Sequence, residues 1–202
     1  MSRIEDTLAM DRRRFLRATL AGTAVALTGA GVLMPRLLAR PAPAPSGASI
    51  EGGEVLLECF ADNGHALGPC HVRKLVLSDA QWHERLSEAA FRIMRRNGTE
   101  PAFSGQHERI GKGIHRCAGC DTALYDAATQ FDSGTGWPSF WQPIARTNVV
   151  QSTDRSFGWR RIAISCAGCD SHLGHVFNDG PRPTGLRYCM NSLALRFVPT
   201  VG

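Results

Sequence analysis

The chain has 202 residues, of which 43% are hydrophobic and 20% charged, and its formal net charge is +5. This length and composition are typical of one substantial globular domain. The positive charge is concentrated near the N-terminus, because residues 1–40 contain seven arginines and only three acidic side chains. The remainder of the chain is close to neutral, which excludes the basic surface expected of a nucleic-acid-binding protein.

The first 45 residues resemble an export signal. Residues 12–16 read Arg-Arg-Arg-Phe-Leu, and an uncharged stretch follows over residues 18–34. An arginine pair ahead of a weakly apolar stretch is typical of a twin-arginine signal, and the small residues at 42–44 are a candidate cleavage site. We therefore expect residues 1–45 to be a signal and a Pro/Ala-rich linker, and the protein to be periplasmic or otherwise exported. The alternative is membrane anchoring through an uncleaved segment.

An N-terminal extension over residues 46–74 precedes the main domain, which we place at 75–199. Within this extension, the apolar run from Val55 to Phe60 predicts a short strand. Cys59 and Cys70 lie on either side of an Asp-Asn-Gly turn. In an oxidising compartment these two cysteines are expected to bond to each other.

One helix and several short strands are predicted further along the chain. Ser78 and Gln81 form the pattern of a capping box, and apolar residues keep helical spacing from Trp82 to Met94. The helix is expected to end at Asn97-Gly98. Beyond it, apolar runs broken by glycine favour a mainly β chain with small antiparallel sheets. These runs are Ile114–Arg116, Phe131, Val149-Val150, Arg161–Ser165 and Leu193–Val198.

Two identical pentapeptides contain paired cysteines. Cys117 and Cys120 belong to Cys-Ala-Gly-Cys-Asp, and Cys166 and Cys169 belong to the same motif, with 45 residues between the two pairs. Two such knuckles complete a tetrahedral thiolate shell for Zn²⁺, and four protein ligands make a structural site with no open position. The alternatives are two disulfides or a thioredoxin-like redox motif, although neither pair follows an apolar strand and opens a helix.

Cys189 stands apart from these pairs in Leu-Arg-Tyr-Cys-Met-Asn-Ser. If Arg187–Phe197 is a strand, Arg187, Cys189 and Asn191 share one face, with Tyr188, Met190 and Ser192 on the other. A guanidinium beside a thiol favours the nucleophilic thiolate. Taken alone, a buried structural cysteine is the more common interpretation.

His172, His175 and Asp179 follow the second knuckle closely. Two histidines that exchange protons near pH 7, and a carboxylate to orient one of them, are the parts of an acid catalyst. The histidines would face opposite sides of a regular strand, so we expect a bulge at Gly174 to bring them together. Taken alone, each histidine is more commonly a core residue or a group that supports a metal ligand.

A glycine-rich loop over residues 131–136 leads into Trp137, Pro138 and Phe140. An indole offers a flat apolar wall with one donor, which suits a small apolar group such as a thioether methyl. Simple packing in the core is the alternative for both aromatic residues.

Four motifs together resemble the type B peptide-methionine sulfoxide reductases, which act on the R epimer. They are GTEPAFSG at 98–105, FDSGTGWPSFWQPI at 131–144, CAGCDSHLGHVFNDGP at 166–181 and LRYCMNSLALRF at 186–197. The resemblance covers roughly residues 75–199 and implies two small antiparallel sheets with short N-terminal helices and a structural Cys₄ zinc site.

The resemblance also implies a role for each candidate residue. Cys189 would attack the sulfoxide sulfur and become a sulfenic acid, and Arg187 would stabilise the anion. His172, His175 and Asp179 would handle the sulfoxide oxygen and its proton. The substrate-binding residues would be Trp137 as the methyl-pocket wall, Phe140, and Asn191 as a hydrogen-bonding partner. The expected substrates are oxidised proteins or free methionine sulfoxide.

Thr135 departs from the family pattern, because many members carry a resolving cysteine there. The sulfenic acid must then be reduced by another cysteine, for which Cys59 and Cys70 are the candidates, or by an outside thiol such as a thioredoxin-like reductant. The sequence contains no nicotinamide or flavin fingerprint, so electrons are expected to arrive through thiol exchange. Two rival readings are a zinc module that binds a partner protein and a disulfide reductase that uses the paired cysteines.

Overall fold

A computed structural model describes residues 52–107, 111–158 and 160–200. The predicted twin-arginine signal, with its alternative role as a membrane anchor, therefore lies outside the described residues. The described residues all belong to one compact unit, so residues 52–74 of the predicted N-terminal extension belong to the same unit as the main domain.

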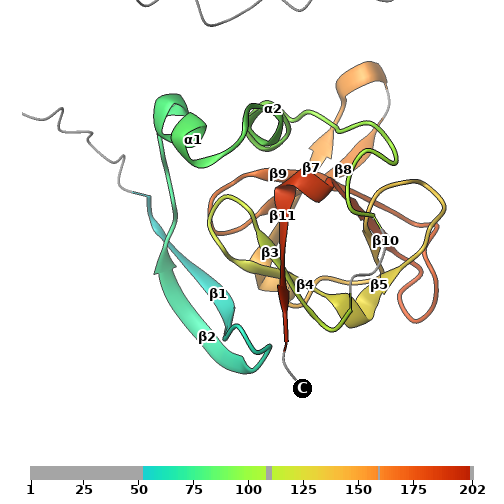
Figure 1. The fold of residues 1–202 in the computed structure, drawn as a ribbon, viewed down its shortest axis with the longest axis horizontal. Coiled ribbons are helices and arrows are strands. Elements are labelled where there is room, and N and C mark those ends of the chain that lie inside the picture. The colour runs from blue at the N-terminus through green and yellow to red at the C-terminus, as the bar shows by residue number, and fades with distance from the viewer. Residues whose placement is uncertain (1–51, 108–110, 159, 201–202) are drawn as a thin grey trace, which may run out of the picture. The chain divides into compact units, whose positions relative to one another are not determined.

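The described strands form three antiparallel sheets (Figure 1). A hairpin of β1 (Glu54–Phe60) and β2 (Ala66–Arg73) stands alone, while the other sheets have the orders β5-β6-β10-β9-β8-β7 and β11-β3-β4. Their bounds are β3 Gly113–Cys117, β4 Ala123–Asp126, β5 Gln130–Phe131, β6 Ser139–Phe140, β7 Val149–Asp154, β8 Arg161–Cys166, β9 His172–Phe177, β10 Arg187–Met190 and β11 Leu195–Pro199. The mainly β class is confirmed. The two expected sheets are accompanied by a third, because β1 and β2 pair with each other.

The predicted single helix is two helices. Ser78 caps α1 (Asp79–Arg85) through the expected capping box, and Ser87 caps α2 (Glu88–Arg96) by accepting from the N–H of Ala90. The backbone of Leu86 is extended, so the helical conformation is interrupted between α1 and α2. Asn97 adopts the left-handed conformation and ends α2. Within the described part of the chain, no helix has the length and apolar character needed to cross a membrane.

The strand expected over Arg187–Phe197 is interrupted. β10 ends at Met190, the 3₁₀ turn η4 (Ser192–Ala194) follows, and β11 joins the other sheet beside β3. The interruption has a tertiary cause, because the N–H groups of Ser192 and Leu193 donate to the carboxylate of Glu100, which is distant in sequence, instead of to a neighbouring strand.

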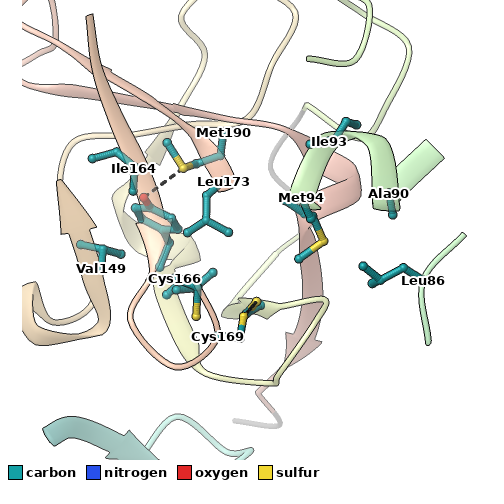
Figure 2. Packing of buried hydrophobic residues seen from close by; sticks show 14 of the residues in the cluster. Leu86, Ala90, Ile93, Met94, Val149, Ile164, Cys166, Cys169, Leu173 and Met190 are labelled. Carbon is teal, nitrogen blue, oxygen red and sulfur yellow. Dashed lines mark hydrogen bonds between the residues drawn. The ribbon is translucent and has the colours of Figure 1, made fainter. Parts of the chain in front are cut away.

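One face of the six-stranded sheet packs into the hydrophobic core (Figure 2). Tyr188 and Met190 of β10 lie on this face with Ile164 of β8, and the Tyr125 hydroxyl donates to the Met190 sulfur at 3.1 Å. Helix α2 contributes Met94 to the same cluster. Arg187 and Cys189 lie on the opposite face of β10, as the predicted alternation requires.

The β1–β2 hairpin is tied to the main domain by polar contacts. The Asn148 amide, in the short η2 turn (Arg146–Asn148), donates to the carbonyls of Glu58 and Ala123 at 2.8 Å and accepts from the Glu58 N–H at 2.8 Å. Asn148 is fully buried, so an amide with satisfied hydrogen bonds joins the hairpin to the start of β4. Two further 3₁₀ turns, η1 (Ala127–Thr129) and η3 (Ser156–Gly158), follow β4 and β7.

Candidate active site

Cys189 lies on β10, one of the two central strands of the six-stranded sheet, between two polar residues on the neighbouring strands. Its register partner on β9 is His175, and its register partner on β6 is Ser139. Register partners point to the same face of a sheet, so the three side chains are neighbours. Gly174 lets β9 and β10 approach closely, because a Cβ there would lie 2.1 Å from the Cys189 carbonyl oxygen.

A cavity of about 120 Å³ opens at this face. Its size suits the end of one side chain rather than a drug-sized ligand. The lining residues are Thr99, Trp137, Arg161, Gly174, His175, Phe177, Cys189, Met190 and Asn191. A larger hollow of about 360 Å³ lies between the hairpin and the first knuckle and is lined by none of these residues.

The indole of Trp137 is fixed in the cavity wall from two sides. Its Nε1–H donates to the Glu100 carbonyl at 3.1 Å, and the carbonyl of the next residue, Pro138, accepts from the Met190 N–H at 2.9 Å. Gly136 has a φ of 82° and a Cβ there would lie 2.6 Å from Phe103, so this turn requires glycine. Trp137 and Cys189 thus line the same cavity.

Burial dominates the electrostatics of Cys189. Desolvation raises the pKa of its thiol, and the Arg187 guanidinium offsets only part of this effect. Arg187 thus acts in the predicted direction, but the thiol, not the thiolate, is favoured in the free protein. Hydroxyl groups are close by: Thr135 Oγ1 lies 3.9 Å from the sulfur, and the Ser133 hydroxyl lies 2.8 Å from the Thr135 hydroxyl.

Asp179 pairs with Arg187 and not with a histidine. The Nε and Nη2 groups of Arg187 donate to the two oxygens of Asp179 at 2.9 and 2.7 Å, and this fork lowers the pKa of Asp179. The guanidinium also lies over the Phe177 ring, 4.4 Å from its centroid. The prediction that Asp179 orients a histidine was wrong, because the Asp179 side chain is hydrogen-bonded to Arg187 of β10.

Asp154 of β7 orients His175 instead. Its Oδ2 lies 2.8 Å from His175 Nε2 and 2.7 Å from the Arg161 guanidinium. A carboxylate only accepts, so Nε2 carries a proton and Nδ1 is the basic nitrogen. Burial lowers the pKa of His175 despite the carboxylate, so the neutral ring is favoured at pH 7.

A bulge brings the two histidines to one face, as predicted, with Leu173 rather than Gly174 as the extra residue. Ile164 pairs with Gly174 but Ser165 pairs with His172, which leaves Leu173 unpaired. The ring centroids of His172 and His175 are therefore 5.2 Å apart. His172 is buried behind His175, and desolvation lowers its pKa to about 4.

Two predicted substrate contacts differ in the structure. Phe140 is fully buried, pairs in register with Tyr188 and stacks on Tyr125 at 4.3 Å, so it belongs to the core face and not to the cavity. Asn191 does line the cavity, but its amide donates to the Leu173 carbonyl and accepts from the Glu100 N–H, both at 3.0 Å. Because both partners are backbone groups, the Asn191 amide holds the cavity wall in place.

The four paired cysteines converge away from this cavity. Their sulfurs all lie within 4.8 Å of one another, with 3.7 Å between Cys117 and Cys169 and 3.4 Å between Cys120 and Cys166. The knuckles repeat each other: the residue after the second cysteine, Asp121 or Asp170, has positive φ and donates its N–H to the first cysteine's carbonyl.

This cluster fits a tetrahedral thiolate site. Zn–S bonds of about 2.3 Å in a tetrahedron place sulfurs about 3.8 Å apart, close to the spacing found. A hydroxyl lies near one sulfur in each knuckle, Thr122 at 3.1 Å from Cys120 and Ser171 at 3.2 Å from Cys169, where it can donate to a thiolate. The cluster can therefore hold a metal ion, and two disulfides are not formed.

Cys59 and Cys70 form a disulfide across the β1–β2 hairpin. The structure therefore contains the expected bond between Cys59 and Cys70. Neither sulfur is a free thiol in this state, and a resolving role would require the hairpin disulfide to open first.

Comparison with known proteins identifies the family. The family model described as the SelR domain matches residues 86–199. The chain belongs to the SelR domain family. The peptide methionine sulfoxide reductase MsrB of Pseudomonas paraeruginosa is 52% identical over 122 residues, which cover 60% of this chain and 92% of that protein. The enzyme of the same name from Azotobacter vinelandii is 50% identical over 127 residues, covering 62% and 96%. That of Leptospira interrogans is 49% identical over 121 residues, covering 59% and 92%.

Sequence reasoning missed four residues of this SelR domain site. Thr99 and Arg161 line the cavity, Asp154 holds His175, and Glu100 contacts Trp137 and Asn191. Glu100 lies in one of the four quoted motifs, which was a usable signal. Asp154 has no such signal, because only the order β7-β8-β9 brings it near His175.

Proposed function

We propose that this protein reduces methionine-R-sulfoxide, free or within oxidised proteins, to methionine through a sulfenic acid on Cys189. Membership of the SelR family and the names of its relatives support the activity. The observation that carries the proposal is the small cavity in which Cys189 faces Trp137 and His175. The choice of the R epimer rests on resemblance to the type B reductases.

The first step needs a nucleophile and a proton for the sulfoxide oxygen. The Cys189 sulfur attacks the sulfoxide sulfur, and its proton passes to Nδ1 of neutral His175 and from there to the oxygen. The protonated oxygen leaves the substrate sulfur and becomes bonded to the Cys189 sulfur. The transient bond between the two sulfurs breaks, methionine leaves and Cys189 becomes a sulfenic acid. The sulfoxide gains two electrons and the thiol loses two, so the step balances.

The other cavity residues bind the substrate and the developing charge. The Trp137 indole supplies an apolar wall for the methyl group. Arg187, which makes two hydrogen bonds to Asp179, stabilises negative charge on the reacting sulfur and oxygen. His172, buried behind His175, keeps that ring in place rather than contacting substrate.

The catalytic cycle closes by thiol exchange. Two thiol groups of a thioredoxin-like reductant convert the sulfenic acid to a thiol, forming one disulfide and one water. Thr135 stands where a resolving cysteine is found in many relatives of this type, so an outside reductant acts directly on Cys189. No nicotinamide or flavin cofactor is part of this proposal.

Zinc is the metal that we propose for Cys117, Cys120, Cys166 and Cys169. With four protein ligands the ion would be structural, and it would join the β3–β4 turn to the β8–β9 turn. These segments are far apart in the sequence, so the ion would stabilise the fold that positions Cys189.

Export through the twin-arginine pathway is a further part of the proposal. It rests on the arginines and the apolar stretch of residues 1–45, with 46–74 as an extension and 75–199 as the reductase domain. Mass spectrometry of protein recovered from cell fractions would identify the cleavage point. Full-length chain in the membrane fraction would favour an anchor instead.

The activity is tested with the resolved enantiomers of methyl p-tolyl sulfoxide and the resolved sulfur epimers of N-acetylmethionine sulfoxide, with dithiothreitol as reductant. We expect turnover of the R epimers and none after Cys189→Ser. A trapped sulfenic acid on Cys189 after one turnover without reductant would support the intermediate. Activity that survives Cys189→Ser would exclude the mechanism, and inactive wild-type protein with bound zinc would favour a binding module.

A further inference from the structure

Glu100 is a buried acidic residue that the proposed chemistry does not use. Its exposed fraction is 5%, and burying a carboxylate is costly unless hydrogen-bond donors compensate it. Three donors do so: the N–H of Ser192, the Ser192 hydroxyl at 2.9 Å and the N–H of Leu193 at 3.2 Å. The carboxylate therefore holds the turn that begins three residues after Cys189.

This arrangement replaces a local cap of the η4 turn. Asn191 precedes the turn but makes no side-chain cap, because its amide is engaged with the Leu173 carbonyl and the Glu100 N–H. Glu100 instead accepts from the first N–H groups of the turn from a distant part of the sequence.

The backbone of Glu100 reaches the cavity wall at the same time. Its carbonyl accepts from the Trp137 indole at 3.1 Å, and its N–H donates to Asn191 at 3.0 Å. The preceding residue, Thr99, lines the cavity directly. Glu100 thus contacts the Trp137 indole, the Asn191 amide and the turn that follows Cys189.

The segment around Glu100 is packed tightly against that chain. A Cβ on Gly105 would lie 1.8 Å from the Ser192 hydroxyl and 3.3 Å from a Glu100 carboxylate oxygen. The Phe103 N–H also donates to the Gly136 carbonyl at 2.9 Å, next to Trp137. The segment from Thr99 to Gly105, which we call the strap, therefore contacts both the Trp137 loop and the η4 turn.

We infer that Glu100 is a positioning residue that sets the distance between the Trp137 wall and the Cys189 sulfur, and so determines how the methyl group of the sulfoxide is held. This inference rests on the proposed sulfoxide reduction. If the carboxylate is lost, the strap and the indole shift together, and substrate binding and epimer selection weaken before the chemistry of the thiol does.

The test compares Glu100→Gln and Glu100→Ala with wild-type protein, and Glu88→Gln on the exposed face of α2 is the matched control. Gln keeps the size but places an N–H₂ group against N–H donors. With N-acetylmethionine sulfoxide we expect KM to rise and kcat/KM to fall at least about tenfold, because small misplacements are costly in reacting sites. The preference for one epimer should fall in parallel, while Glu88→Gln leaves all three values unchanged.

A second readout does not depend on activity. In protein labelled with ¹⁵N-tryptophan, the Trp137 indole N–H signal, assigned with Trp137→Phe, should move in both Glu100 variants because its acceptor moves. Loss of kcat alone, in proportion to a smaller folded fraction, with unchanged KM, epimer preference and Trp137 signal, would overturn the inference. If wild-type protein reduces neither epimer, the proposed function fails while the indole signal still decides the role of Glu100.

Discussion

Asp154 and His175 form a 2.8 Å hydrogen bond although they belong to β7 and β9, with β8 between them. The register partner of His175 on β8 is Ala163, whose small side chain leaves room for the two longer ones to meet. We expect Asp154→Asn to lower kcat by about ten- to a hundredfold, because the wrong ring orientation slows proton transfer. Asp79→Asn in α1 is the matched control. A kcat equal to wild type would show that Asp154 only serves the fold.

The pH dependence of Cys189 alkylation reports the balance between burial and Arg187. Burial raises the pKa of this thiol, so the midpoint of the iodoacetamide rate against pH should lie above that of an exposed cysteine. Arg187→Gln removes the cation that lowers this pKa, so its midpoint should move further up. Arg92→Gln, in the exposed part of α2, should not move it. A midpoint below that of an exposed cysteine would contradict the burial argument.

Loss of one knuckle thiol should release the metal. We expect wild-type protein to contain one zinc ion per chain and Cys120→Ser to contain little, with the free energy of unfolding lowered by several kcal/mol. Metal content by mass spectrometry and the midpoint of thermal unfolding check both statements. Cys189→Ser should keep the zinc and the midpoint. Equal metal loss in both variants would place Cys189 among the ligands.

The hairpin disulfide is expected to matter for stability and not for turnover. It closes a loop with a sequence separation of 11 residues, and chain-entropy reasoning gives about 3 kcal/mol for a loop of that size. The double variant Cys59→Ser with Cys70→Ser should unfold more easily but reduce sulfoxide at the wild-type rate with dithiothreitol or a thioredoxin. A defect with thioredoxin alone, together with a Cys189 disulfide that is lost in the variant, would instead identify a resolving cysteine.

His172 should make the protein less stable in acid. Its pKa is lowered to about 4 in the folded state from an ordinary value of 6.5. Between these values the unfolded chain binds the proton more readily, so the free energy of unfolding falls as the pH falls from 6.5 towards 4. His172→Phe should reduce this slope by up to about 1.4 kcal/mol per pH unit. Urea unfolding across this range measures it, with the exposed His71→Phe as the control; identical slopes would refute the prediction.

Several features of the site were readable from short segments of sequence. The duplicated knuckles of Cys117 and Cys166 are repeated in the structure, since each turn is formed by five or six adjacent residues. The alternation that puts Arg187 and Cys189 on one face holds because β10 is a regular strand. The bulge in β9 was also anticipated, from the conflict between the spacing of two histidines and the period of a strand.

Errors arose where distant segments compete for the same groups. One helix was predicted where Ser87 starts a second, and one strand was predicted where Glu100 draws the N–H groups of Ser192 and Leu193 out of the ladder. Phe140 was assigned to the substrate because its motif is beside Trp137. Its register with Tyr188 turns it to the core face instead.

By itself the sequence determined which chemical groups are available: four thiols at knuckle spacing, a fifth beside an arginine, two histidines and an indole after a glycine loop. Residue type and short spacing are local properties, so they are written in the chain directly. Only the tertiary structure decided that Asp154 holds His175, that Asp179 holds Arg187, and that burial outweighs the guanidinium at Cys189. Sheet order, register and desolvation depend on the whole packed fold, and no single segment encodes them.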